Sequence, residues 1–567
     1  SVTADEWDRV YRIVELAQRV RENLGTPVAQ KEEWLNLYAA ADATSVVVNI
    51  GDKTEPTMPT RWKTFGQAQV SVNKASPPPT TFGWAISSPL LALSQGQRTV
   101  TLILGFEAEH FQTDTLRALF SLPPATQNGN PGPFPLDQNT SPFHIEISTE
   151  KGWVEPTTIK VNIQDYSRLL GRATDPNEAS PAIYLELFFA ENVAAITPLA
   201  IPDAQIAAPS PVLRLMLRQI WQPDHAESTT GRYITHYQPF RDLVLSKTSL
   251  RVAVNGLTNF QLENDEAVLD AAKPFEPFGS NPAVGSHLYI GHPELITNKL
   301  DSLTFQVEWM GGPTDLKSYY TNYSAITADN TFTTQINLID QRLALPLATA
   351  APLFAQSGAT WDATQPQTIA LADIPAAIGK ARPGYVYARN ISLNTTGDLL
   401  TWNRYWQWEL NAPDFQHAAY PVVATHKSLE LAAAAIANKQ GIKPEDYQVN
   451  PPYTPKIKKL SLNYTSSVEI LLAAYQPGAQ LDQIFYVQPF GYQEIQPEAQ
   501  PPHALFLPQY ANEGELYLGI QAVNPPQNLA LLFQMAEGSA NPDIAPAPVQ
   551  WSYLSANQWV SLDNGNV

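Results

Sequence analysis

The sequence of 567 residues contains no cysteine. Disulfides, thiolate catalysis and cysteine-based zinc sites are therefore excluded, and the composition suits folding in a reducing compartment. The sequence also lacks an apolar run long enough to cross a bilayer, and its start has no charged-then-apolar export signal. We therefore expect no direct insertion into a membrane.

Glycine is scarce, with 28 residues, whereas proline is abundant, with 49. In an average protein glycine makes up about 7% of residues and proline about 5%, so the usual order is reversed here. Proline fixes the backbone φ angle and removes a hydrogen-bond donor. The composition therefore predicts stiff connections between folded parts.

Basic residues are few: 35 Lys and Arg stand against 54 Asp and Glu, which gives a formal net charge of −19. Binding to nucleic acid needs a dense basic face, so this balance argues against a nucleic-acid partner. Hydrophobic residues make up 44% of the chain and aromatic residues 10%, which is ample material for a folded core. The length predicts about three to five domains.

The segment 273–279 reads KPFEPFG, and its two prolines rule out a helix or a central strand. We expect a rigid, extended connector whose Phe275 and Phe278 anchor a neighbouring surface at low entropic cost. Short strands are expected after it, at 287–290 and 301–308, where apolar residues alternate with polar ones.

The first part of the chain has helical rather than strand-like spacing. Apolar residues in 5–25 and 29–41 predict two amphipathic helices, the second of which carries Trp34. Two helices alone leave apolar faces uncovered. They are expected either to pack on the body of the protein or to join a bundle with partner chains.

From residue 85 onward, short apolar runs between turn signals predict strands and hairpins. The expected strands, besides the two named above, lie at 97–104, 144–148, 183–189, 243–246 paired with 250–254, 385–391, 406–410, 460–464, 484–491, 514–520, 549–554 and 558–562. An alanine-rich helix is expected at 428–439, before Gly441. The fold class is thus mainly β with an N-terminal helical segment, in antiparallel β-sandwich-like modules joined by proline-rich connectors.

Four parts are expected along the chain. Residues 1–60 form the helical segment, 61–260 a first β-rich domain, 261–383 the central connector with a second β-rich domain, and 384–567 a C-terminal β-rich domain. The sequence opens at Ser1 without Met and closes in the polar DNGNV, so both ends are expected to be cut from a longer polypeptide.

Several short blocks resemble one protein family. They include SPLLALSQGQRTVTL at 88–102, PFEPFG at 274–279, YIG at 289–291 and PPYTPKIKKLSLNY at 451–464. Their order is similar to that in baseplate wedge proteins of contractile injection systems, the phage-tail-like particles related to type VI secretion baseplates and to phage baseplate J-like proteins. One departure is Gln416, which stands where the family pattern has glycine; a residue other than glycine tolerates a positive φ poorly.

The resemblance implies a structural subunit of a baseplate wedge and no enzymatic activity, catalytic residue, metal or cofactor. It implies contacts with copies of this chain, a second wedge protein, the spike hub and the sheath-initiating proteins, in a ring that rearranges on firing. The particle would be assembled in the bacterial cytoplasm and then be released or anchored to a membrane. Tyrosine suits such contacts because its ring buries area while its hydroxyl stays wet. The interface candidates are Phe275, Phe278, Tyr289, Tyr319, Tyr320, Tyr323 and Trp34.

Residues capable of chemistry are scattered. The nine histidines show no metal-binding spacing, and His287 and His292 are interpreted as turn or surface residues. Arg98 is either a ligand cation or, as we favour, a structural charge beside a turn. The alternative function is a secreted or surface carbohydrate-binding or glycan-cleaving β-sandwich. It would use tryptophans such as Trp402, Trp406, Trp408, Trp551 and Trp559 with the carboxylates Glu409 and Asp414. Trp406 and Trp408 lie two apart on one face of a strand, however, where core packing is the commoner explanation.

Overall fold

A computed structural model describes part of the chain. The described residues are 70–71, 82–124, 132–170, 180–199, 206, 208–223, 225, 230–326, 332–358, 360–389, 398–437, 441–488, 491–497, 503–509, 516–520, 531, 549–555 and 558–562. The two helices expected near the N-terminus, and Trp34 with them, lie outside these residues.

The chain divides into two compact units, and neither is a continuous segment. The first comprises Ser1–Lys74, Asp224–Arg232 and Tyr510–Gln550; the second comprises Ala75–Pro223, Tyr233–Gln509 and Trp551–Val567. In the first unit β1 (Val70–Ser71) pairs antiparallel with the start of β11 (Thr230–Thr235), with Val70 opposite Gly231. The four domains expected from the sequence stay a prediction.

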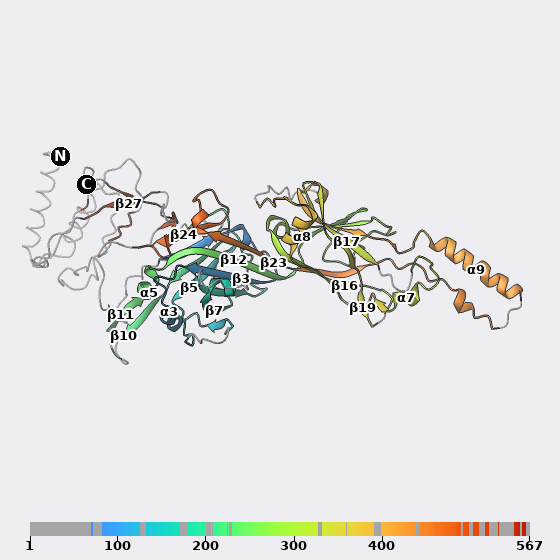
Figure 1. Cartoon of the computed structure of the whole chain (residues 1–567), viewed down its shortest axis with the longest axis horizontal. Coiled ribbons are helices and arrows are strands. Elements are labelled where there is room, and N and C mark those ends of the chain that lie inside the picture. The colour runs from blue at the N-terminus through green and yellow to red at the C-terminus, as the bar shows by residue number, and fades with distance from the viewer. Residues whose placement is uncertain are drawn as a thin grey trace, which may run out of the picture. The chain divides into compact units, whose positions relative to one another are not determined.

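The largest sheet of the second unit has nine strands, and all its pairs are antiparallel. Figure 1 shows its long strands β12 and β23 side by side. In spatial order the strands are β21 (Gln367–Leu371), β16 (Leu300–Trp309), β23 (Ile457–Leu471), β12 (Val244–Leu257), β3 (Gln97–Phe106), β8 (Pro181–Phe189), β7 (Thr158–Asp165) and β4 (Phe134–Leu136), and β26 (Ala504–Leu505) pairs with β12.

Two six-stranded antiparallel sheets accompany it. One has the order β25 (Gly491–Glu494), β24 (Gln483–Gln488), β2 (Gly83–Ser87), β9 (Val212–Leu217), β5 (Phe143–Thr149), β6 (Gly152–Val154). The other has the order β14 (Val268–Leu269), β13 (Gln261–Asn264), β15 (His287–Gly291), β22 (Arg404–Leu410), β17 (Thr333–Asp340), β18 (Leu343–Pro352). Hairpins are formed by β19 (Ala355–Ser357) with β20 (Thr360–Asp362) and by β27 (Ser552–Ser555) with β28 (Gln558–Ser561), and β10 spans Gln219–Pro223.

The helices among the described residues are short, with one exception. These α-helices are α3 (Thr113–Leu119), α4 (Tyr166–Leu169), α5 (Tyr237–Arg241), α6 (Pro293–Thr297), α7 (Leu316–Tyr319), α8 (Ile374–Ala381) and, the longest of them, α9 (Tyr420–Ile436). The 3-10 turns are η1 (Pro89–Leu91), η3 (Leu399–Thr401), η4 (Pro444–Tyr447) and η5 (Leu472–Ala474). The mainly antiparallel β fold predicted from the sequence is thus confirmed for the described residues.

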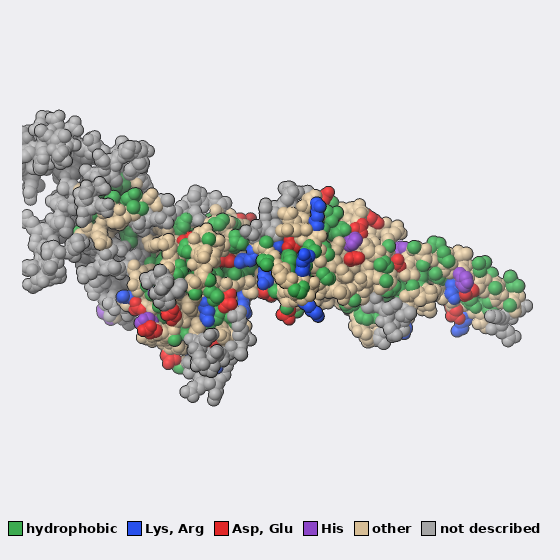
Figure 2. Space-filling model, turned by 45° about the horizontal axis from the view of Figure 1, so that its top comes forward, with side chains coloured by type: hydrophobic (Ala, Val, Ile, Leu, Met, Phe, Trp, Pro, Cys, Tyr) green, Lys and Arg blue, Asp and Glu red, His purple; other side chains and the backbone are tan. Residues whose placement is uncertain are grey.

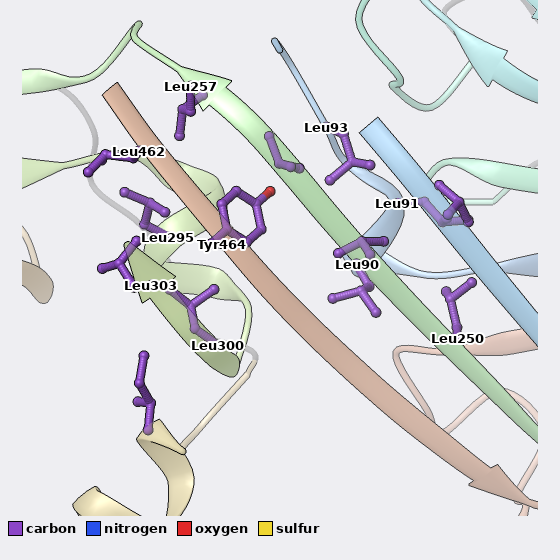
Figure 3. Close-up of a cluster of buried hydrophobic side chains, with 14 of the residues drawn as sticks. Leu90, Leu91, Leu93, Leu250, Leu257, Leu295, Leu300, Leu303, Leu462 and Tyr464 are labelled. Atoms are coloured by element: carbon purple, nitrogen blue, oxygen red, sulfur yellow. The ribbon is translucent and has the colours of Figure 1, made fainter. Parts of the chain in front are cut away.

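Alternation along the strands places one set of side chains in a shared core. On β16 and β23 the residues at every second position are buried, among them Leu303 and Tyr464. Figure 3 shows Leu250 of β12 and the leucines around η1 in the same buried cluster. Each such leucine removed from water contributes about 1.5–3 kcal/mol to folding. The long strands therefore join the two ends of the second unit through one continuous core.

One predicted hairpin is wrong. Residues 243–246 and 250–254 do not pair with each other, because 244–246 and 250–254 belong to the single strand β12. Lys247, Thr248 and Ser249 between them include no glycine, proline or asparagine that would favour a turn. A bulge opposite β3, between Leu245 and Lys247, accounts for the break in the apolar pattern.

Three other boundaries differ from expectation. Residues 385–389 form no strand, because their side chains bind neighbouring elements in place of a backbone ladder, as described below. Residues 516–520 are not a strand either, and their apolar side chains Leu516, Leu518 and Ile520 are exposed. Helix α9 begins at Tyr420 and not at Ser428, because Pro421 occupies its first turn, where a missing N–H costs nothing.

Candidate interaction surface

The connector 273–279 is fixed to the start of β23. The N–H of Phe275 donates to the carbonyl of Ile457 at 3.0 Å, and the N–H of Ile457 donates back at 2.8 Å. The rings of Phe275 and Phe278 are buried in the core of this chain. The sequence predicted a rigid, extended connector. The backbone is extended at Phe275 but turns at Pro277 and Phe278, where the N–H of Gly279 donates to the carbonyl of Glu276 at 3.4 Å. That these two rings contact another subunit stays a prediction, and inside the chain they already serve as packing.

Gly279 ends the connector in a conformation that suits glycine. Its φ is +77°, and a Cβ there would lie 2.4 Å from Oε1 of Glu266. The same carboxylate accepts the N–H of Ser280 at 3.1 Å. The glycine thus allows Glu266 to close the connector onto the loop that precedes β14.

The three tyrosines of 319–323 hold a later part of the chain. The hydroxyl of Tyr319 donates to the carbonyl of Pro451 at 2.9 Å, and that of Tyr323 donates to the carbonyl of Asn450 at 2.5 Å. The amide of Asn450 donates back to the carbonyl of Tyr319 at 2.9 Å. A contact of Tyr319, Tyr320 or Tyr323 with a partner stays a prediction; their placement shows that they secure the segment 448–453.

Tyr320 lies deeper and joins both ends of the segment that carries α9. Its hydroxyl donates to the carbonyl of Phe415 at 3.3 Å and accepts the N–H of Tyr453 at 2.9 Å. Phe332 stacks on Phe415 with ring centroids 4.2 Å apart and planes 7° from parallel. Phe354 and Tyr453 complete this aromatic base, which we define as Tyr320, Phe332, Phe354, Phe415 and Tyr453.

Burial in this region keeps tyrosine hydroxyls neutral. It raises the pKa of Tyr323 and of Tyr453 to about 12, and that of Tyr320 further above its usual value of 10.0. A neutral hydroxyl can donate to a carbonyl oxygen, whereas a phenolate cannot. The hydrogen bonds that fix the segment 411–455 therefore persist throughout the physiological pH range.

Tyr289 on β15 is also mostly buried. Its hydroxyl donates to Asp265 Oδ1 at 3.1 Å, and its ring stacks on that of His287 with centroids 5.6 Å apart. Asp265 also accepts the N–H of His287 at 2.7 Å. Tyr289 therefore helps to fix the turn before β15, and its role as an interface residue stays a prediction.

Beyond the aromatic base, α9 presents an apolar face to solvent. Ala434 is buried and Lys427, Glu430 and Leu431 on the same side of the helix are half-buried. On the opposite side, Val422, Leu429 and Ile436 are 72%, 65% and 85% exposed. Figure 2 shows hydrophobic side chains covering much of α9, at the right of the view. Pro421, Val422, Thr425, His426 and Leu429 line a shallow recess on this face. The interface candidates expected from the sequence did not include this face, although its seven-residue spacing is readable in the sequence.

A protein-family model described as "Baseplate protein PVC11-like" matches residues 240–567, which is more than half of the chain. The chain belongs to this family. It is therefore a baseplate protein of a phage-tail-like contractile injection system, as the resemblance of its sequence blocks indicated. No curated protein matches it. The matched range contains the connector, the aromatic base and α9.

In this baseplate protein Gln416 adopts the positive φ expected for the glycine of the family pattern. Its φ is +65°, and its side-chain amide donates to Asp414 Oδ1 at 2.7 Å. The carboxylate of Asp414 also accepts the N–H of Gln416 at 2.9 Å. The local bonds offset part of the strain that a side chain meets in this conformation.

The structural role of Arg98 is confirmed in the baseplate protein. Its side chain is fully buried, and its guanidinium donates to the carbonyls of Ala190, Val193 and Ala194 at 2.7–3.1 Å. It therefore closes the turn after β8. Glu294, which the sequence did not single out, is buried nearby; it accepts the hydroxyl of Tyr464 and the N–H of Ser94.

The segment 385–389 ties two sheets together through side chains. Tyr385 donates its hydroxyl to Asp340 at the end of β17, and Arg404 of β22 donates to the same carboxylate at 3.0 Å. At the other end, Arg389 donates through two nitrogens to Asp482, which precedes β24, at 2.6 and 3.2 Å. The strand predicted for this segment is therefore wrong; its alternating aromatic residues are typical of strands as well as of such side-chain ties.

The geometry of the described residues gives little support for a metal site or for a sugar-binding site. Within them, no three His, Asp or Glu side chains lie close enough to hold a metal ion. Burial lowers the pKa of His292, whose Nδ1 accepts the N–H of Glu294 at 3.2 Å as the cap of α6. Trp402, Trp406 and Trp408 are buried, so their rings offer no platform for a sugar. None of the described helices is long and apolar enough to span a membrane.

Proposed function

We propose that this baseplate protein is a structural subunit of the wedge, which surrounds the spike hub, links it to the sheath and rearranges on firing. The family match is the observation that carries the proposal, because it covers the connector, the β23 core and α9 together. A structural role in the baseplate follows from the family itself.

The construction of the second unit supports a load-bearing role. β12 pairs with β23 over ten registered positions, from Lys247–Leu471 to Leu257–Leu462, and β23 pairs with β16 over most of that strand. The buried pair Arg404–Asp340 joins β22 to β17 within one sheet, and the pair Arg389–Asp482 joins the segment 385–389 to the residue before β24 of another sheet. A body joined in this way moves as a unit, so a displacement at one end is transmitted to the other.

The proposed partners are copies of this chain, a second wedge protein, the spike hub and the sheath-initiating proteins. Contact with other baseplate components follows from the family, and these particular neighbours are the proposal. We further propose that the wedge is assembled in the bacterial cytoplasm and performs no catalysis. The particle would then be released or anchored to a membrane with the protein in place.

Omission of this chain from the particle tests the proposal. Cells producing all other particle components are expected to yield no sheathed tube with a complete baseplate, and the intact chain supplied in trans is expected to restore it. Electron microscopy of restored particles should place the chain in a sixfold collar around the spike. Complete collars without the chain, or a chain located only on the tube or fibres, would overturn the wedge assignment.

A further inference from the structure

The exposed face of α9 carries large aliphatic side chains at seven-residue intervals, namely Val422, Leu429 and Ile436. Between them lie the smaller Thr425, Ala432 and Ala433, and His426, all exposed. We call these seven residues the α9 stripe. Spacings of three and four residues along a helix place side chains on one face, as in a coiled-coil seam.

The α9 stripe has no charged residue to keep it in water. Of the residues in α9, only Lys427 and Glu430 are permanently charged, and they pair with each other at 2.8 Å outside the stripe. His426 lies 3.1 Å from the same Glu430 carboxylate. Lys427 and Glu430 lie on the half-buried side with Ala434, so the exposed side is the apolar one. A helix with its apolar face toward solvent is typical of one that is covered in its assembled state.

We propose that the α9 stripe binds the α9 stripe of a second copy of this chain, with the two helices antiparallel. The inference rests on the proposed function, because copies of the chain meet in the wedge. It adds the surface through which they meet.

The order of side chains makes the stripe self-complementary in that arrangement. With Leu429 opposite Leu429 of the second copy, Val422 faces Ile436, Thr425 faces Ala433 and His426 faces Ala432. Large side chains then meet at the ends and the centre, and small ones between them let the helix axes approach. Antiparallel packing also sets each helix dipole against the opposite end of its partner.

Charge argues for a second copy over a different helix. Coiled-coil partners of different sequence are usually selected by charges beside the seam, and the charges beside this stripe are already paired within the chain. A chain of net charge −19 repels its copies over most surfaces, so a neutral face is where two copies approach at least cost.

Both ends of the segment that carries α9 are already fixed within the chain, before any contact with a second copy. Phe415 and Tyr453, at the two ends of the segment that carries the helix, are both packed into the aromatic base. Little backbone freedom is then lost when the stripe is covered. One pair of helices buries less area than the ~1,200 Å² of a stable interface, so the contact is expected to be weak alone and reinforced in the ring.

The absence of cysteine makes a direct test possible. Leu429→Cys in the full chain places one thiol at the proposed centre, and Ala435→Cys places one on an exposed side of α9 outside the stripe. Under mild oxidation of the concentrated chain, Leu429→Cys is expected to form a disulfide-linked dimer, and Ala435→Cys is not. Equal dimer formation by both variants, or none by either, would overturn the proposal.

A second readout uses assembled particles and names the occupant. A benzophenone attached to Cys of the Leu429→Cys variant is expected to crosslink to the α9 peptide of another copy. A crosslink to a different baseplate chain, or to no protein, would overturn the self-contact. Particles that keep a complete baseplate while showing no α9–α9 crosslink would refute this inference and leave the wedge proposal standing.

Discussion

The guanidinium of Arg404 lies over the ring of Tyr387, with its central carbon 3.7 Å from the ring centroid. Arg404 has no exposed surface and donates to Asp340, which is also buried, at 3.0 Å. Its other terminal nitrogen donates to the carbonyls of Ile296 and Ala388 at 2.7 and 3.1 Å. One side chain thus joins β22, β17, α6 and the segment 385–389.

Arg404→Lys is expected to destabilise the chain by about 3–5 kcal/mol. A lysine keeps the charge but cannot stack on Tyr387 while donating to both carbonyls, and so leaves buried partners unsatisfied. Urea unfolding followed by tryptophan fluorescence measures the change. Arg389→Lys is the matched control: that arginine is partly exposed, so a loss of only about 1 kcal/mol is expected. Equal losses in the two variants would contradict the assigned role of Arg404.

Position 416 allows a comparison of two substitutions that remove the same hydrogen bonds. Gln416→Gly and Gln416→Ala both lose the amide that donates to Asp414, but only glycine is at ease at a φ of +65°. We expect the glycine variant to be more stable than the alanine variant by about 1 kcal/mol. Thermal unfolding of the two proteins gives the difference, and an alanine variant at least as stable would argue against strain at this position.

The prediction that Phe275 and Phe278 contact another subunit needs a test that separates an effect on folding from an effect on assembly. Phe275 and Phe278 are buried within the chain, so replacing both with alanine is expected to lower stability by about 3–5 kcal/mol for each ring. Failure of that double variant to assemble would then reflect lost folding as well as lost contact. Phe275→Leu with Phe278→Leu retains most of the volume and is expected to keep the fold. A double alanine variant with an unchanged melting temperature would show that the two rings contribute little to this core.

Local sequence patterns predicted many of the strands and helices, but they could not predict contacts between residues far apart in the sequence. The alternation in 301–308 gave β16, because it depends on neighbours in sequence. The connector 273–279 is extended only around Phe275 and turns at Pro277 and Phe278, so the prolines predicted its stiffness better than its course. The partners of Tyr320 lie 95 and 133 residues away, so nothing near it in sequence shows that its hydroxyl joins Phe415 to Tyr453. For the same reason residues 385–391 were predicted as a strand, since alternation does not reveal Asp340 or Asp482 as binding partners.

The interface candidates show where this limit matters most. Aromatic residues between prolines or in clusters are typical of both protein cores and protein interfaces, because each buries large apolar area. Composition alone could not separate the two for Phe275, Tyr320 or Tyr323. The exposed fraction of each side chain distinguishes core residues from interface candidates. Among the described residues it indicates Val422, Leu429 and Ile436, whose seven-residue spacing is visible in the sequence.

Alkaline pH is expected to loosen the segment that carries α9 before the chain unfolds. Burial raises the pKa of Tyr323 and Tyr453 from 10.0 to about 12, so the folded state holds these protons more tightly than the unfolded state. The stability that they contribute is fully present below pH 10 and is lost as the pH rises from 10 towards 12. Hydrogen exchange of peptides from 411–455, compared at pH 9 and pH 11 after correction for intrinsic rates, should show selective loss of protection.

Two variants establish whether Tyr323 is responsible for part of that change. Tyr323→Phe removes the bond to the carbonyl of Asn450 at all pH values, so it is expected to lower protection already at pH 9 and to reduce the further loss by pH 11. Tyr492→Phe, in β25, is the control and should leave the 411–455 peptides unchanged. If Tyr323→Phe shows the same loss between pH 9 and pH 11 as the unaltered chain, ionisation of this hydroxyl does not release the segment.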